Sequence, residues 1–184
     1  LAALGHRDVA VIAPTGTGEL ADVDYRPDRA TPGVPSPSYQ DDRLRGLWQT
    51  LPAGSLRVVT CATNTRQAGR EAAARGLDAA DRPTALGALS DVVALGVLDA
   101  ARVGGLTPGQ EVSVAGFDDI PDAAYTGLTT VRQPIREKGR LAGLLAMDPD
   151  YHQRQITLPI DLVVRSSTGP VTPSACTHRH HQNT

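Results

Sequence analysis

The hydrophobic positions of this chain form short apolar runs that alternate with segments of helical period. Short runs of Val, Leu, Ile and Ala bounded by turn residues are typical of strands that are buried on both faces of a parallel sheet. They predict strands at 9–13, 57–62, 84–89, 112–117 and 160–165. Apolar residues spaced three or four apart predict helices at 38–51, 65–75, 91–103 and 134–147. This alternation predicts an α/β fold, a doubly wound parallel sheet with helices on both faces.

Three segments lack either period. Residues 1–8 read as the end of a helix that Gly5 stops, followed by a crossover. Residues 14–38 are rich in Gly, Pro, Asp and Thr and predict a long loop, which we expect to be disordered or a plain surface insertion rather than a structured lid. Residues 169–184 predict a disordered tail.

Composition excludes some classes of partner. The formal net charge of −2 and the pI near 6.2 provide no basic surface, so this chain alone should not bind nucleic acid through its phosphates. No apolar run is long enough to cross a membrane. Cys61 and Cys176 make no disulfide framework, which agrees with a cytoplasmic protein. The chain starts at Leu1, so we expect the native N-terminus to lie upstream.

The motifs of common enzymes are missing, and we predict that the chain is not an enzyme. It has no G-x-S-x-G elbow, and a P-loop is excluded because Lys138 is the only lysine. The glycines at 16 and 18 lack the third glycine of a dinucleotide-binding turn. In the tail, metal-ligand types occur at irregular spacing, so we predict no metal site and no cofactor there. They are Cys176, His178, His180 and His181.

Polar residues instead follow the predicted strands. Arg43 comes after the first strand, Asn64 after the second, Ser90 and Asp91 after the third and Asp118 after the fourth. The carboxyl ends of parallel strands meet at one edge, where open α/β sheets bind ligands. An arginine fork and a carboxylate suit a small polyhydroxylated molecule. The alternative is that Ser90 and Asn64 cap helices, Arg43 is solvated and Asp118 stabilises its own turn.

Around these residues the sequence resembles the lactose-repressor (LacI/GalR) class of bacterial transcription regulators. The run VSVAGFDDIPDAAYTGLTTVRQPIREKGRLAGLL is similar to the signature of the effector domain in that family. The segments LAALGHRDVAVIAP, RLRGLW, RPTALGALSDVVALGVLDAARVGGL and LPIDLVVRSST also resemble it. The likeness covers nearly everything except 16–38 and the tail.

The resemblance implies a periplasmic-binding-protein-like type I fold, of which this chain is mainly one subdomain. Residues 9–133 would form the C-terminal effector-binding subdomain, with 129–134 as the strand that crosses to the other subdomain. Residues 134–159 would pack on that other subdomain, and 160–168 would be the closing strand. It also implies an allosteric, cytoplasmic homodimer, a repressor that binds a sugar-like or nucleoside-like effector and reaches operator DNA through a helix-turn-helix outside this chain. A solute-binding protein of a sugar transporter is the alternative.

The resemblance also assigns effector contacts. Arg43 matches the effector-contacting arginine, and Asp118 matches the acid that accepts effector hydroxyls. Ser90 stands where many members have Asn, and Asn64 stands where an aromatic ring often stacks on the sugar, so both contacts are weakened. Further candidates complete the set, and Asp119 is left open between ligand and loop. They are Tyr39, Asp91 and Gln133.

Overall fold

The computed structural model describes residues 1–15, 22–23, 38–52, 55–77, 82–147 and 155–172. Within them the strands form one seven-stranded sheet in the order β2-β3-β1-β4-β5-β6-β7. Neighbours from β3 to β6 are parallel, whereas β2 and β7 pair antiparallel at the two edges. The predicted α/β fold class is therefore confirmed, with antiparallel edges that the sequence did not predict.

The helices and strands follow the predicted alternation closely. The strands are β1 (Val9–Pro14), β2 (Asp22–Val23), β3 (Leu56–Cys61), β4 (Ala85–Ala88), β5 (Ser113–Asp118), β6 (Thr129–Arg132) and β7 (Asp161–Val163). The helices are η1 (Ala2–Leu4), α1 (Ser38–Thr50), α2 (Arg66–Leu77), α3 (Asp91–Val103), α4 (Pro121–Thr126) and α5 (Ile135–Met147).

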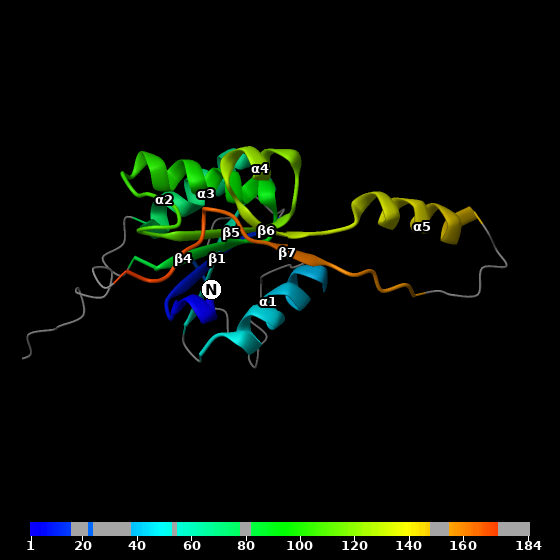
Figure 1. The fold of residues 1–184 in the computed structure, drawn as a ribbon, viewed down its shortest axis with the longest axis horizontal. Coiled ribbons are helices and arrows are strands. Elements are labelled where there is room, and N and C mark those ends of the chain that lie inside the picture. The colour runs from blue at the N-terminus through cyan, green and yellow to red at the C-terminus, as the bar shows by residue number, and fades with distance from the viewer. Residues whose placement is uncertain (16–21, 24–37, 53–54, 78–81, 148–154, 173–184) are drawn as a thin grey trace, which may run out of the picture.

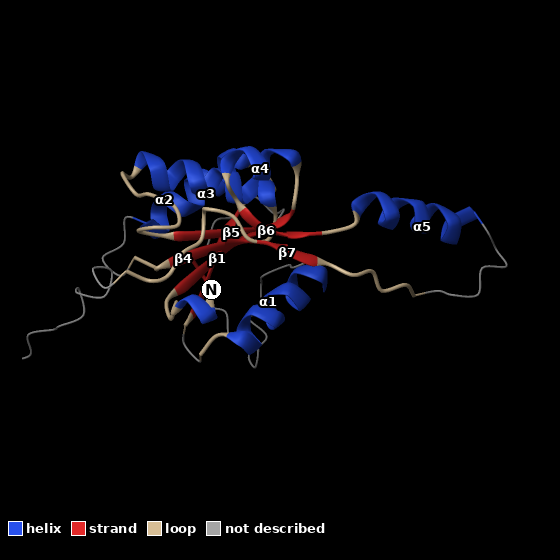
Figure 2. Cartoon of the chain, in the orientation of Figure 1, coloured by secondary structure: helices blue, strands red, loops and turns tan. Residues whose placement is uncertain are grey.

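Helices cover both faces of the sheet. Figures 1 and 2 show α2, α3 and α4 on one face and α1 with η1 on the other. Each face has its own apolar core, and both are built mainly from Val, Ala and Leu, with Ile12 and Cys61 in the larger one. Helices α2 and α3 pack closely at Gly96. A Cβ atom at this position would collide with the Arg66 carbonyl oxygen, so the close approach requires glycine. The sheet is thus held rigidly from both sides.

Two described elements lie where no secondary structure was predicted. Strand β2 falls inside the predicted loop 14–38 and pairs with β3, although most of that loop lies outside the described residues. Helix α4 follows β5 and is too short to show a helical period. It begins at a proline and ends at Gly127 in the left-handed conformation, which are the ordinary start and stop signals of a helix.

Residues 169–172, at the start of the predicted tail, make backbone hydrogen bonds to the body. The Gly169 amide donates to Ser113 Oγ at 3.0 Å, and the Val171 amide donates to the Leu4 carbonyl at 3.1 Å. Residues 173–184, including Cys176 and the histidines of the tail, lie outside the described residues.

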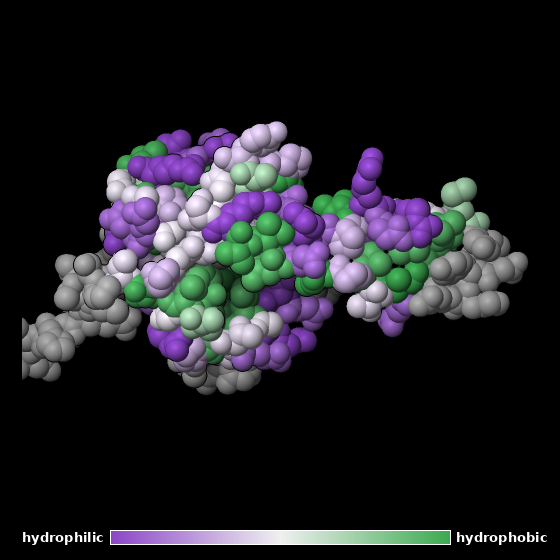
Figure 3. All heavy atoms as spheres, in the orientation of Figure 1, coloured by the Kyte–Doolittle hydropathy of each residue, from purple (hydrophilic) through white to green (hydrophobic). Residues whose placement is uncertain are grey.

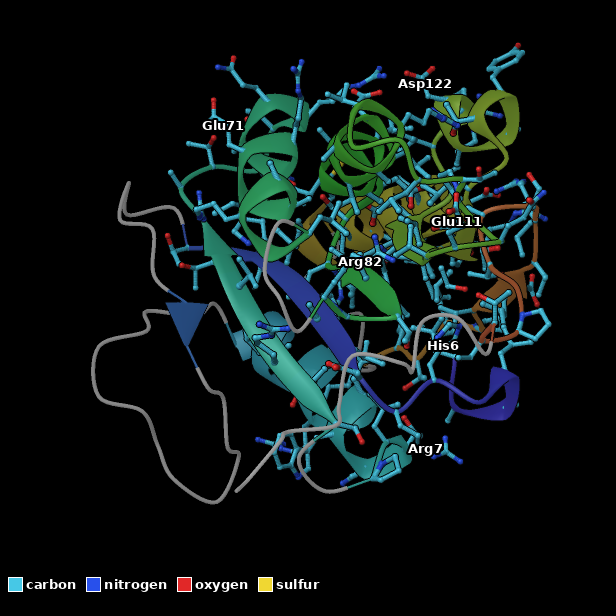
Figure 4. All side chains as sticks on the ribbon, turned by 90° about the vertical axis from the view of Figure 1, so that its left-hand side faces the viewer. His6, Arg7, Glu71, Arg82, Glu111 and Asp122 are labelled. Atoms are coloured by element: carbon cyan, nitrogen blue, oxygen red, sulfur yellow. The ribbon has the colours of Figure 1, made fainter. Side chains whose placement is uncertain are left out.

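His6 lies in the core beneath this segment, as Figure 4 shows. Its ring nitrogens lie 2.9 Å from Thr84 Oγ1 and 2.9 Å from Ser113 Oγ, and Nε2 is 3.0 Å from the Gly169 carbonyl oxygen. Only 2% of the residue is exposed. The imidazole therefore joins the segment before β1 to the start of β4, to β5 and to the segment after β7 in one polar cluster.

We expect this cluster to make stability depend on pH. Burial lowers the pKa of His6 below its ordinary 6.5, against an opposing hydrogen bond with Gly169. The unfolded chain then takes up the proton first, so the free energy of unfolding should fall as the pH drops below about 6.5. Urea titrations at pH 8 and pH 5.5 measure this, with His6→Gln as the control that should lose the difference. An equal pH dependence in both proteins would contradict it.

Helix α5 stands apart from the body of the molecule. Figure 1 shows it beyond the end of β6, away from the sheet and from the other helices. None of its residues is buried, and apolar side chains lie exposed along it and along residues 160–164 (Figure 3). They include Ile135, Leu144, Met147, Ile160 and Leu162. Among all the described helices, α5 included, none has the length and apolar composition that a membrane span requires.

Candidate functional site

The candidate site lies at the carboxyl edge of the sheet, near the point where the winding reverses. From β1 the chain passes over one face through α1 to β3, and then over the other face through α2 to β4. Strands β1 and β4 are neighbours, so the loops at their carboxyl ends lead away to opposite faces. In doubly wound sheets this arrangement opens a space above the strand ends.

Arg43 reaches this edge from α1. Its Nη1 donates to the Leu89 carbonyl at 2.6 Å, just beyond β4, and its guanidinium lies 3.8 Å from the centre of the Phe117 ring in β5. The ring face attracts a cation and fixes the plane of the guanidinium. The alternative that Arg43 is simply solvated is wrong, because the side chain is half-buried and packed against two strands.

Asp118 is the last residue of β5, and its carboxylate shares this edge. Oδ1 accepts from Gln133 Nε2 at 2.6 Å, so the amide that follows β6 joins the site. Burial raises the pKa of Asp118 above its usual value, with the neighbouring Asp91 charge adding to this and the Gln133 hydrogen bond and Arg43 opposing it. The backbone is strained here, because Asp118 has φ 129° and Asp119 has φ 59°.

Ser90 and Asn64 lie together at the neighbouring strand ends. Ser90 Oγ donates to Asn64 Oδ1 and also accepts from the Val93 amide at 3.4 Å, so Ser90 caps α3 as one alternative predicted. Asn64 is exposed and does not cap α2, because Thr65 Oγ1 accepts from the Ala68 amide in that role. The hydroxyl and amide thus face the same edge from two strands.

Asp91 is placed differently from the other candidates, because it is fully buried. Oδ1 accepts from Thr130 Oγ1 at 2.6 Å, and Oδ2 accepts from the Ile120 amide at 2.9 Å. The carboxylate therefore ties the start of α3 to β6 and to the turn after β5. Gly116 makes the room for it, since a Cβ atom there would collide with Asp91 Oδ1.

Asp119, left open by the sequence, contacts two arginines. Oδ2 accepts from Arg132 Nε at 2.6 Å, and Oδ1 accepts from Arg165 Nη2 at 2.7 Å. Although burial pushes the pKa of Asp119 upward, these two hydrogen bonds hold it below its usual value. Sequence reasoning missed both partners, which lie far from Asp119 along the chain.

The edge gathers polar side chains of several kinds. It presents a planar cation, a half-buried carboxylate, an amide and a hydroxyl, the groups that pair with the hydroxyls of a polar molecule. Among the described residues no three His, Cys, Asp or Glu side chains gather as a metal site. Tyr39 belongs to α1 by its backbone, but its side chain lies outside the described part.

The sequence matches the periplasmic binding protein-like domain family over residues 1–168. The HTH-type transcriptional regulator DegA of Bacillus subtilis is 31% identical over 181 residues, which cover 93% of this chain and 48% of that protein. The HTH-type transcriptional repressor CytR of Escherichia coli K12 is 35% identical over 136 residues, covering 68% and 40%. The chain therefore spans less than half the length of these relatives.

Solved structures show the same fold. A LacI-family transcriptional regulator from Corynebacterium glutamicum matches with a TM-score of 0.77 and 27% identity, covering 91% of this chain and 52% of that one. A LacI-family regulator from Enterococcus faecium, solved with bound ribose, matches with a TM-score of 0.68 and 25% identity, covering 94% and 60%.

Proposed function

This chain belongs to the periplasmic binding protein-like domain family, with HTH-type regulators of the LacI family among its relatives, and we propose that it senses a small polar effector for such a regulator. The resemblance predicted from the sequence is thereby confirmed. The names of the relatives point to regulation and not to catalysis.

One observation carries the proposal: Arg43, Asp118 and Gln133 come from three different elements and meet at the carboxyl edge. The guanidinium is fixed on Phe117, and the carboxylate is held by Gln133, so the pair is ordered before any ligand arrives. Ser90 and Asn64 extend the same edge. We leave Asp91 out of the contact set, because both of its oxygens serve the fold.

The class of effector is a sugar or a related metabolite. A polyhydroxylated molecule offers donors to Asp118 and acceptors to Arg43 and Gln133, with charge-assisted hydrogen bonds at both charged groups. The ribose bound in the Enterococcus faecium structure supports this class for the present chain. D-ribose is accordingly the first compound to test.

The wider role is allosteric control of transcription in the cytoplasm. We propose that the effector lies between this subdomain and a second one that covers α5, and that the regulator, a homodimer, binds operator DNA through a helix-turn-helix. An effector that binds one closure state better than the other then changes operator affinity. The exposed apolar side chains of α5 support the presence of a second subdomain that packs on this helix.

A ligand screen with paired variants tests the site. At concentrations well above Kd, D-ribose or another pentose, hexose or nucleoside should raise the Tm by several degrees. Arg43→Lys should weaken, by about tenfold, the binding of the compound that raises the Tm, because lysine keeps the charge but lacks the planar guanidinium.

Arg45→Lys is the matched control. It lies on the same helix, exposed and paired only locally with Asp42 at 3.2 Å, so the ligand response should be unchanged. Equal responses of the two variants would remove Arg43 from the site, and a flat response across the whole panel would overturn the proposed effector class.

A further inference from the structure

Asp119 holds together three segments that come from different parts of the fold. Only 9% of its side chain is exposed, and its carboxylate forms ion pairs with Arg132 at the end of β6 and with Arg165 just after β7. Arg165 also donates to the Leu128 carbonyl at 2.7 Å, which fixes the guanidinium from its other side. One carboxylate therefore joins the turn after β5 to the end of β6, from which the chain continues to α5, and to the segment after β7 (Figure 1).

Asp118 at the end of β5 and Asp119 just after it have different partners. Asp118 faces Gln133, whereas Asp119 faces Arg132, the residue immediately before Gln133. Register places Asp118 opposite Arg132, so the β5 and β6 ends are paired through backbone and side chains alike. A displacement of β6 at this point moves the partners of both acids together.

The backbone of the turn requires such support. Positive φ at two successive residues other than glycine costs free energy, and it persists only where surrounding contacts hold it. The contacts here are the two ion pairs of Asp119, the Gln133 hydrogen bond and the Ile120 amide on Asp91 Oδ2. We therefore expect the turn to relax when the ion pairs are lost, and the orientation of the Asp118 carboxylate to change with it.

We propose that Asp119 is a positioning residue that couples the end of β6 and the segment after β7 with the orientation of the Asp118 carboxylate. The proposal rests on the proposed function for its biological meaning, since a second subdomain that moves α5, the helix that follows β6, would act on the effector site through this contact. Asp119 itself touches no effector. It transmits a shift of either segment, through one peptide bond, to the residue that does.

The test measures amide hydrogen exchange by NMR in the chain without any ligand. The Ile120 amide reports on the turn, and the Arg165 amide, which donates to Thr129 Oγ1 at 2.9 Å, reports on the segment after β7. Asp119→Asn keeps the size and tolerates positive φ, but it loses the charge. Both amides should exchange about tenfold faster.

The Ala94 amide in α3, bonded to the Ser90 carbonyl at 3.0 Å, is the internal reference and should not change. Asp119→Glu should return both rates toward the original values. Acceleration at Ile120 alone, or at neither amide, overturns the proposal.

If Asp119→Asn speeds all three amides equally, the milder Arg132→Gln decides, because it leaves the Arg165 pair intact. It should accelerate Ile120 and Arg165 about threefold and spare Ala94. Unchanged rates at Ile120 and Arg165 in that variant overturn the coupling. Because no ligand is used, this failure is distinct from a failure of the effector site.

Discussion

Replacing Asp118 by alanine is expected to weaken the binding of a polyhydroxylated effector by about a hundredfold or more. The carboxylate is half-buried at the end of β5 and fixed by Gln133, so it can accept two hydroxyl donors without reordering. A hydrogen bond to a charged group contributes about 1.5–3 kcal/mol, and two of them account for this loss. Titration of the fluorescence of Trp48, the only tryptophan of the sequence, measures the affinity.

Two further variants separate binding from folding. Asp118→Asn tolerates the positive φ and should also bind weakly, because an amide offers one acceptor oxygen in place of two. Asp122→Asn, an exposed acid in the first turn of α4, should bind as the original chain does. An Asp118→Ala protein that keeps its affinity, while unfolding at the same temperature, would remove this carboxylate from the site.

Replacing Asp91 by alanine is expected to lower the free energy of unfolding by about 3 kcal/mol. The change strands the Ile120 amide and the Thr130 hydroxyl, and Thr130 is fully buried. Each buried group without a partner costs about 1–3 kcal/mol, while the shorter side chain leaves a small void. Urea unfolding followed by circular dichroism gives the value.

Asp99→Ala on the same helix is the matched control. Asp99 pairs with Arg66 at 2.6 Å near the surface, where such a pair contributes less than about 1 kcal/mol. The two variants should therefore differ clearly although both remove an ion from α3. If both variants lose the same free energy of unfolding, the buried hydrogen bonds of Asp91 do not stabilise the fold more than a surface ion pair does.

The fold was predictable as far as periodicity reaches. Strands β1, β3, β4 and β5 and the longer helices have apolar spacings that the sequence shows directly. Strand β2 has two residues and no period, so pairing with β3 alone defines it. The antiparallel direction of β7 depends on the long return from α5, which no local pattern contains.

The candidate site was predictable by position but not by role. Asp91, Asp118 and Asp119 all lie at or just after strand ends, and no local pattern tells which carboxylate is buried within the fold, which faces the edge and which pairs with arginines. The difference lies in partners remote along the chain, such as Thr130 for Asp91 and Arg165 for Asp119. The cation–π contact of Arg43 with Phe117 is likewise a product of tertiary packing.

Chemical-shift mapping of the chain during titration with D-ribose and the rest of the sugar and nucleoside panel shows directly whether an effector binds at this edge. We expect the largest shifts on Arg43, Leu89, Asp118 and Gln133, at the carboxyl edge of the sheet. The cluster around His6, at the opposite ends of the strands, should stay unchanged. Shifts centred on His6 and Ser113, or none with any compound of the panel, would contradict an effector site at this edge.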